Sequence, residues 1–223
     1  MHLQSPENNL QPALTEASLL EAVGELAARD PDMAEIAANF GPPPLWARPP
    51  GFPTLIYIIL EQQVSLASAR AAFDRLQAAA SPLTPESFLQ LDDAELQGIG
   101  FSRQKAGYGR ILANALLNNL LDLESLATLP DDQVRLALLA IKGIGPWTAE
   151  IYLLMALLRP DAWPSSDLAL GQAARRVKRL PGPPGPDELA RLGEAYRPWR
   201  SVAARLLWHD YLSRRKSDVN SML

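Results

Sequence analysis

Three features of the amino-acid sequence predict an all-α fold. Alanine and leucine are abundant whereas valine is scarce, a composition that favours helices over strands. Apolar residues recur at helical intervals, for example at Leu19, Leu20, Val23 and Leu26. No useful length of chain alternates polar and apolar residues, although residues 54–59 (T-L-I-Y-I-I) would also fit a short strand. With 223 residues, of which 48% are hydrophobic, the chain is able to bury a core.

The helices expected from this pattern follow one another along the chain. Segments rich in proline and glycine separate several of them, and the first of these segments, residues 41–53, cannot be helical and is expected to be an ordered connector. Pro85 fits the first position of a short helix, where a missing N–H group costs nothing. The expected helices cover residues 16–28, 54–79, a short segment from 85, 105–121, 131–140, 146–158, 168–178, 187–195 and 199–213.

Composition and charge exclude several classes of protein. The chain has no cysteine, which excludes disulfides, thiolate zinc sites and iron–sulfur clusters. No apolar stretch is long enough to span a bilayer and the first residues do not resemble a signal peptide, so we expect a cytoplasmic protein with no membrane partner. The net charge of −4 argues mildly against nucleic acid as a partner, but residues 172–216 are strongly basic. Net charge alone therefore does not exclude a polyanion.

Residues 141–150, I-K-G-I-G-P-W-T-A-E, predict a tight turn between two helices. Glycine permits positive φ and leaves the amides of the turn uncovered, and Pro146 fits the first position of the second helix. Exposed amides at a helix N-terminus bind anions such as a nucleic-acid phosphate without any net positive charge. Taken alone, the two glycines fit a capped turn between packed helices at least as well.

Four motifs in order carry a resemblance to a known family. They are I-L-E-Q-Q-V-S-L-A-S-A (59–69), L-L-A-I-K-G-I-G-P-W-T-A-E (138–150), W-P-S-S-D-L-A-L (163–170) and Y-R-P-W-R-S-V-A-A-R-L-L-W (196–208). Together they resemble the helix–hairpin–helix DNA glycosylase superfamily, and within it the branch of bacterial 3-methyladenine DNA glycosylase II. The resemblance extends over about residues 53–211.

The resemblance implies a single glycosylase domain, residues 1–223, made of two helical subdomains with the active-site cleft between them. One subdomain would cover residues 54–160 and contain the hairpin, 139–150. The other would combine residues 1–53 and 161–223. The nearest branch begins with a β-rich domain that this sequence lacks, so the chain resembles the shortened, purely helical members, and we expect a broader substrate range as a result.

By its place in the third motif, Asp167 corresponds to the catalytic aspartate of the family. A fixed carboxylate stabilises the positive charge that develops on the sugar when an N-glycosidic bond breaks, or orients a water molecule. An alkylated purine is already cationic and leaves without a strong general acid. The local sequence Ser-Ser-Asp is also good chemistry for capping the helix that follows, so a purely structural role for Asp167 stays open.

Trp147 and Trp208 match aromatic positions that line the base pocket in the family, where a flipped cationic base gains from stacking and cation–π contacts. Tyr152 and Trp46 are weaker candidates for the same pocket, and core packing is the alternative for each of these rings. The family's bifunctional members carry a lysine where this chain has Trp147, so the resemblance implies a monofunctional enzyme without AP-lyase activity. Ile151 stands where the nearest branch has a pocket tyrosine.

The resemblance also implies how DNA is held. The amides of Gly143, Gly145 and Thr148 match those that bind a backbone phosphate, and Ile144, between the two glycines, is expected to contact DNA with them. Carbonyl groups of the same turn are candidates for a structural cation; no other cofactor and no metal centre are expected. Gln63 matches the residue that fills the gap left by a flipped base, although the Gln62–Gln63 pair would also fit a cap or a solvated loop.

Basic residues near the third motif leave a further choice open. Arg175, Arg176 and Lys178 fit a surface that faces phosphates and fit a solvated helix face equally well. 

The function that the resemblance implies is hydrolysis of the N-glycosidic bond of alkylated bases, such as 3-methyladenine and 7-methylguanine, in base-excision repair. The expected partner is double-stranded DNA that contains alkylated bases, bound by a monomer. A glycosylase for oxidised or mismatched bases, a non-catalytic DNA-binding hairpin module and a helical protein-interaction domain are the alternatives.

Overall fold

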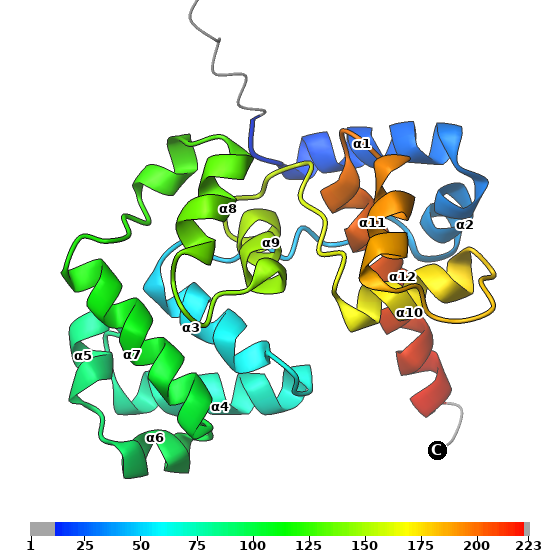
Figure 1. Ribbon diagram of the computed structural model, residues 1–223. Coiled ribbons are helices and arrows are strands. Elements are labelled where there is room, and N and C mark those ends of the chain that lie inside the picture. Colours follow the sequence, from blue (N-terminus) through cyan, green and yellow to red (C-terminus); the bar gives the residue numbers. More distant parts are fainter. Residues whose placement is uncertain (1–11, 221–223) are drawn as a thin grey trace, which may run out of the picture. The chain divides into compact units, whose positions relative to one another are not determined.

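The computed structural model describes the backbone of residues 12–220 and the side chains of residues 12–215. Every regular element in these residues is helical, as the sequence predicts, and none is a strand (Figure 1). The described chain forms two compact units. Unit 1 is Arg48–Leu157, and unit 2 combines residues 12–47 with residues 158–220.

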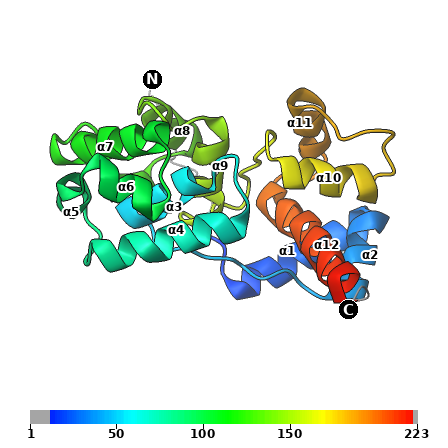
Figure 2. The same cartoon turned by 90° about the horizontal axis from the view of Figure 1, so that it is seen from below.

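Unit 1 is built around one buried helix, α3. Leu55, Ile56, Ile58 and Ile59 of this helix are fully buried. Figure 2 shows α3 between α4 and α7, and it also packs against α9. The helices of unit 1 are α3 (Phe52–Glu61), α4 (Leu66–Ala79), α5 (Pro85–Gln90), α6 (Asp93–Ile99), α7 (Arg103–Leu117), the 3-10 turn η1 (Ser125–Thr128), α8 (Asp131–Leu139) and α9 (Pro146–Met155).

The single helix expected over residues 54–79 is wrong, because the structure has two. The chain leaves α3 after Glu61, Gln63 adopts a left-handed conformation with φ +56°, and Ser65 caps α4 by accepting a hydrogen bond from the Ser68 amide. The apolar run at residues 54–59 is helical rather than extended. This segment resembled a strand because α3 is buried on nearly all sides. It therefore shows no alternation of polar and apolar faces with the 3.6-residue period of a helix.

Unit 2 contains a helix that the sequence analysis missed, α2. Pro31 reads as a helix breaker, but it occupies the first turn of α2, where its missing N–H group has no cost. Asp30 ends α1 and caps α2, since its carboxylate accepts hydrogen bonds from the amides of Asp32 and Met33. The helices of unit 2 are α1 (Glu16–Arg29), α2 (Pro31–Phe40), α10 (Leu168–Val177), α11 (Pro186–Glu194) and α12 (Arg200–Asn220).

In unit 2, α12 packs against α1, α2 and α10 and carries a buried arginine. The guanidinium of Arg205 donates to the carbonyls of Leu45, 2.9 Å away, and Ser201, 3.1 Å away. Burial lowers the pKa of Arg205 to about 10. Because Leu45 lies in the non-helical connector, this arginine fixes the chain next to Trp46.

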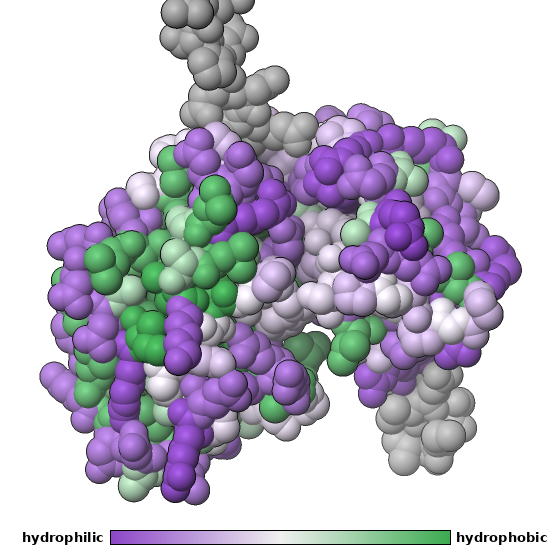
Figure 3. All heavy atoms as spheres, viewed as in Figure 1, coloured by the Kyte–Doolittle hydropathy of each residue, from purple (hydrophilic) through white to green (hydrophobic). Residues whose placement is uncertain are grey.

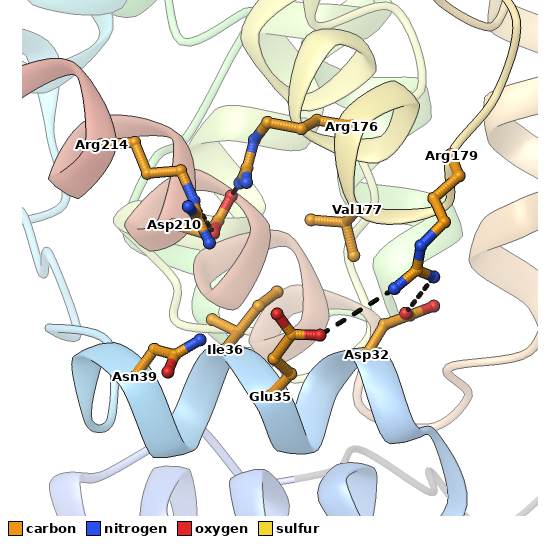
Figure 4. Close-up of a pocket in the computed structure, with 9 residues that line it drawn as sticks. All are labelled: Asp32, Glu35, Ile36, Asn39, Arg176, Val177, Arg179, Asp210 and Arg214. Carbon is orange, nitrogen blue, oxygen red and sulfur yellow. Dashed lines mark hydrogen bonds and ion pairs between the residues drawn. The ribbon is translucent and has the colours of Figure 1, made fainter. Parts of the chain in front are cut away.

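Most of the basic charge in residues 172–216 is paired inside unit 2. Figure 4 shows Arg176 of α10 and Arg214 of α12 both reaching the buried carboxylate of Asp210, with Arg179 directed toward α2. Lys178 forms ion pairs with Asp30 and Asp32 of 2.6 and 2.7 Å. A pocket of about 70 Å³ has balanced charge, because its charged lining residues are Asp32, Glu35, Asp210, Arg176, Arg179 and Arg214. Arg176 and Lys178 hold the end of α10 to α12 and α2 through their ion pairs and are not simply solvated.

The surface of unit 1 carries apolar side chains over α7 and α8 (Figure 3). The large exposed apolar residues in this part of the chain are Ile111, Leu117, Leu120, Leu136 and Leu139. No helix in the described part of the chain is both long and apolar enough to cross a membrane.

Candidate functional site

The hairpin of unit 1 consists of α8, a turn at residues 140–145, and α9. Gly143 has φ +102°, and a Cβ atom on it would lie 2.3 Å from Cγ of Tyr108. Gly145 has φ −96°, and a Cβ atom there would meet nothing within 4 Å. Gly143 is therefore required by the fold of the turn, whereas the fold places no such demand on Gly145. An approaching ligand would explain a glycine at the second position.

The turn leads into an uncapped helix N-terminus. Gly145 is the N-cap residue of α9 and has no side chain to cap the helix, and Pro146 follows at the first helical position. The amides of Gly145 and Thr148 lie in this first turn, and the helix dipole favours an anion there. This geometry fits the phosphate site expected from the sequence.

Ile144 is largely used inside the turn. Its side chain is buried, and its amide donates a hydrogen bond of 3.0 Å to the carbonyl of Ile141. Ile144 therefore holds the hairpin together, and its expected contact with DNA stays a prediction.

The loop of residues 62–65 between α3 and α4, hereafter the gap loop, holds Gln63 at the surface. Gln63 is exposed and has left-handed backbone geometry. Val64 and Leu66, which follow it in the chain, are also exposed, at 46% and 59%. Gln62 behaves differently, because its side-chain amide bonds to the hairpin. The two glutamines therefore do not form an equivalent pair.

Trp147 and Tyr152 both lie on α9 but differ in accessibility. Trp147 is half-buried in the first turn of the helix. Tyr152 is fully buried, and its hydroxyl oxygen accepts a hydrogen bond of 3.1 Å from the Gly51 amide. Burial raises the pKa of Tyr152, which the Gly51 bond partly offsets. The structure thus gives Tyr152 a packing role in unit 1, which argues against it as a residue of the base pocket.

In unit 2, Asp167 is held by two hydrogen bonds. Its Oδ1 atom accepts one of 2.7 Å from the amide of Leu170, so Asp167 does cap α10, and a second of 3.1 Å from Nε1 of Trp208. The side chain is half-buried. The capping role and a functional role are compatible, because the cap fixes the orientation that a catalytic carboxylate needs.

Trp208 and Trp46 complete this cluster, which we call the Asp167 cluster. Trp208 is 7% exposed and meets Trp46 edge to face, with ring centroids 6.5 Å apart. Trp46 is half-buried, has φ +49° and also meets His209 edge to face. Residues 46, 167 and 208 are distant in the sequence, and unit 2 joins them in a chain of contacts from the carboxylate of Asp167 to Trp208 and from Trp208 to Trp46.

Sequence reasoning missed three residues that support these sites. Tyr108 of α7 lies against Gly143, Arg205 fixes the connector beside Trp46, and Gln62 joins the gap loop to the hairpin. A buried arginine carries no local sequence signal, since its neighbours in α12 are apolar. The described residues contain no group of three or more side chains placed to hold a metal ion.

Comparison with known proteins places these features in a family. Residues 56–198 match the HhH-GPD superfamily of base excision DNA repair proteins. The chain is 28% identical over 180 residues to DNA-3-methyladenine glycosylase 1 of Schizosaccharomyces pombe, covering 79% of each chain. It is 32% identical over 124 residues to the Bacillus subtilis protein YfjP; this match covers 56% of the chain and 43% of YfjP, less than half of that relative's length.

A solved structure extends the likeness to three dimensions. The 3-methyladenine DNA glycosylase Mag1 of Schizosaccharomyces pombe, in complex with abasic DNA, superposes with a TM-score of 0.78 at 28% identity. The superposition covers 84% of this chain and 95% of the Mag1 chain.

Proposed function

The chain belongs to the HhH-GPD superfamily of base excision DNA repair proteins, and we propose that it is a DNA glycosylase that hydrolyses the N-glycosidic bond of alkylated bases. The observation that carries the proposal is the Asp167 cluster. It presents a carboxylate that is oriented by a helix cap and by the indole N–H of Trp208, whose ring in turn meets the ring of Trp46. The names of the relatives and of the structural neighbour support alkylated DNA as the substrate.

The reaction depends on an ionised carboxylate and not on a general acid that protonates the leaving base. As the glycosidic bond lengthens, positive charge develops on the sugar, and the fixed carboxylate of Asp167 stabilises that charge or orients the attacking water. A base alkylated at a ring nitrogen carries its own positive charge and leaves with the bonding electron pair, becoming neutral. Water supplies the hydroxyl group to the sugar and releases one proton. The chemistry requires no cofactor.

Trp208 contributes to this step in two ways. Its N–H group holds Oδ1 of Asp167, and its ring with that of Trp46 offers an aromatic face on which a cationic base is favoured. We propose separately that the ring of Trp147, in unit 1, contacts the flipped base. Because this tryptophan occupies the place of the lyase lysine, no amine stands there to form a Schiff base, and the enzyme leaves the DNA strand uncut.

Unit 1 would hold the DNA. We propose that a backbone phosphate binds at the amides of Gly145 and Thr148, and that Gln63 enters the gap left by the flipped base. The carbonyls of the hairpin turn remain a proposed site for a structural cation. The protein acts on double-stranded DNA as a monomer in this proposal.

The test is release of free base from methylated duplex DNA, with the products identified by chromatography. We expect 3-methyladenine and 7-methylguanine to appear and the strand to stay intact until alkali is added. A broader range would add 1-methyladenine or 3-methylcytosine; release of 3-methyladenine alone would contradict the expected breadth. If no alkylated base is released while the protein binds DNA, the chain is a non-catalytic hairpin module and the proposal fails.

A further inference from the structure

Gln62 connects two parts of unit 1 that the proposed function uses separately. Its side-chain Nε2 donates hydrogen bonds of 3.1 Å to the carbonyl of Gly143 and 3.0 Å to Oγ1 of Thr148. Gln62 is the C-cap residue of α3 and the first residue of the gap loop, whereas its two acceptors belong to the hairpin. We propose that Gln62 is a positioning residue that sets the place of Gln63 relative to the phosphate-binding turn. The inference rests on the proposed function.

The acceptors of Gln62 are themselves fixed. Tyr108 lies against Gly143 so closely that no Cβ atom fits there, and the positive φ of Gly143 determines where its carbonyl points. Thr148 is 1% exposed, so its hydroxyl is held within unit 1. Two rigid acceptors from different sides of the turn therefore define one position for the amide of Gln62.

The end of α3 is held by two further side chains. Nζ of Lys105 donates a hydrogen bond of 2.8 Å to the carbonyl of Leu60, and burial lowers the pKa of this lysine. Arg48 makes a two-bonded ion pair with Glu61, with distances of 2.8 and 2.7 Å. Three consecutive residues, 60–62, are thus tied to α7, to the start of the unit and to the hairpin. The next residue, Gln63, is exposed at the surface.

Glutamine suits this position because of its donors. Its NH₂ group offers two N–H bonds to two acceptors, which a glutamate of the same length lacks when ionised. A carboxylate there would instead face the Gly143 carbonyl, oxygen against oxygen. Gln62→Glu keeps the size and polarity of the side chain but removes its N–H donors. Gln62→Met keeps the length of the side chain and removes all of its hydrogen-bonding groups. Comparing the two variants distinguishes the contribution of the hydrogen bonds from that of side-chain packing.

The functional consequence concerns distance along the DNA. In bound DNA, the distance between the phosphate at the hairpin and the gap left by the flipped base is fixed by the DNA. The protein must therefore hold its phosphate-binding turn and the side chain of Gln63 at a matching, constant distance. With Gln62 in place, the energy of phosphate binding is available to place Gln63. Without Gln62, the gap loop moves independently of the hairpin, and the population of bound DNA with its base flipped out is lower.

The experiment is a double-mutant cycle on the full chain with Gln62→Ala, Gln63→Ala and both together. We expect Gln62→Ala to slow single-turnover release of 7-methylguanine about tenfold, while affinity for undamaged duplex stays within about twofold of wild type. In the Gln63→Ala background, the same change should slow release by less than about threefold, because the residue it positions is gone. A merely structural role would give additive effects.

A second readout does not depend on catalysis. With 2-aminopurine opposite an abasic-site analogue, binding of the wild-type protein should change the fluorescence as Gln63 enters the gap, and Gln62→Ala should lose most of that change. Gln97→Ala changes an exposed glutamine of α6, outside the hairpin and the gap loop, and is the control that should behave as wild type. Thr148→Val removes one acceptor of Gln62 and should act as a milder Gln62→Ala. If Gln62→Ala fails to fold, Gln62→Met and Thr148→Val replace it in the cycle.

The outcomes are distinguishable. A wild-type protein that releases no base overturns the proposed function, yet the fluorescence arm still reports whether Gln62 places Gln63. A wild-type protein that is active, with Gln62→Ala releasing base at an equal rate or with additive effects in the cycle, overturns the positioning role alone.

Discussion

The hairpin turn of unit 1 uses six consecutive residues, 140–145, whereas the side chains of the Asp167 cluster come from positions 46, 167 and 208. The first site is made of backbone, so its chemistry depends on glycines and on a helix N-terminus. The second is made of side chains, so its chemistry depends on how α10, α12 and the connector pack in unit 2. Substitutions that add atoms to a glycine should disrupt the backbone site, whereas substitutions that remove a hydrogen bond should disrupt the side-chain site.

Gly143→Ala should produce the largest effect at the backbone site. The new methyl group would lie within 2.3 Å of the Tyr108 ring at a φ of +102°. We expect a loss of about 3 kcal/mol in the free energy of unfolding, from overpacking and backbone strain together. Denaturant unfolding measures it. A variant with wild-type stability would show that the turn is not constrained as described.

Lys178→Met should weaken unit 2 through its ion pairs, at a cost of about 2 kcal/mol for leaving the carboxylates of Asp30 and Asp32 without their cation. Burial of Asp32 opposes its ionisation, but hydrogen bonds and charge from Lys178, and then from Arg179, outweigh burial and hold its pKa below the usual 3.8. This contribution is complete above pH 4 to 5 and is lost as the pH falls through the lowered pKa of Asp32.

Stability measured against pH tests how far the packing of unit 2, on which its side-chain site depends, rests on this ion pair. The wild-type protein should lose stability on acidification below about pH 4, and the Lys178→Met protein should lose less over the same interval. Parallel curves for the two proteins would contradict the role given to this ion pair.

Trp208→Phe keeps a ring but removes the N–H group that holds Asp167. We expect base release to slow roughly tenfold, which corresponds to about 1.4 kcal/mol in the activation free energy. Trp199→Phe is a matched control, because Trp199 also donates its indole N–H to a carboxylate, that of Glu25 at 2.6 Å, away from Asp167. Equal rates for both variants and wild type would remove Trp208 from the catalytic arrangement.

Gly145→Ala should have the smallest effect on the fold and a selective effect on DNA. A Cβ atom has free space at this position, so the change should cost no more than about 1 kcal/mol of stability, that of a poorer N-cap. If a phosphate approaches this amide, affinity for duplex DNA should fall about fivefold in fluorescence anisotropy. Unchanged affinity would place the phosphate elsewhere.

Local patterns explain how much of the structure could be predicted. The all-α fold, the hairpin and the cap at Asp167 follow from residues near one another in the chain, and all are present in the structure. The break at Gln62–Ser65 was missed because Q-Q-V-S contains no glycine or proline to mark the end of a helix. The helix α2 was missed because a proline can begin a helix as well as interrupt one, and Pro31 begins α2.

The supporting contacts could not be predicted, because they join residues far apart in the sequence. Tyr108 against Gly143, Arg205 at the Leu45 carbonyl and Trp208 at Asp167 exist only once the helices have packed. Tyr152 was a weaker candidate for the base pocket, with core packing as its alternative. Its burial depends on the contacts of α9 inside unit 1, which the motif does not encode.

The most direct measurement of the central claim is base release by Asp167→Asn. Asparagine also caps helices, so α10 and the fold should be retained, while the negative charge is lost. We predict that release of 3-methyladenine falls at least a hundredfold while binding to an abasic-site analogue stays within a few-fold of wild type. Glu188→Gln, a change to an acidic residue in the first turn of α11, serves as the control and should be fully active. Release by Asp167→Asn at the wild-type rate would contradict the account.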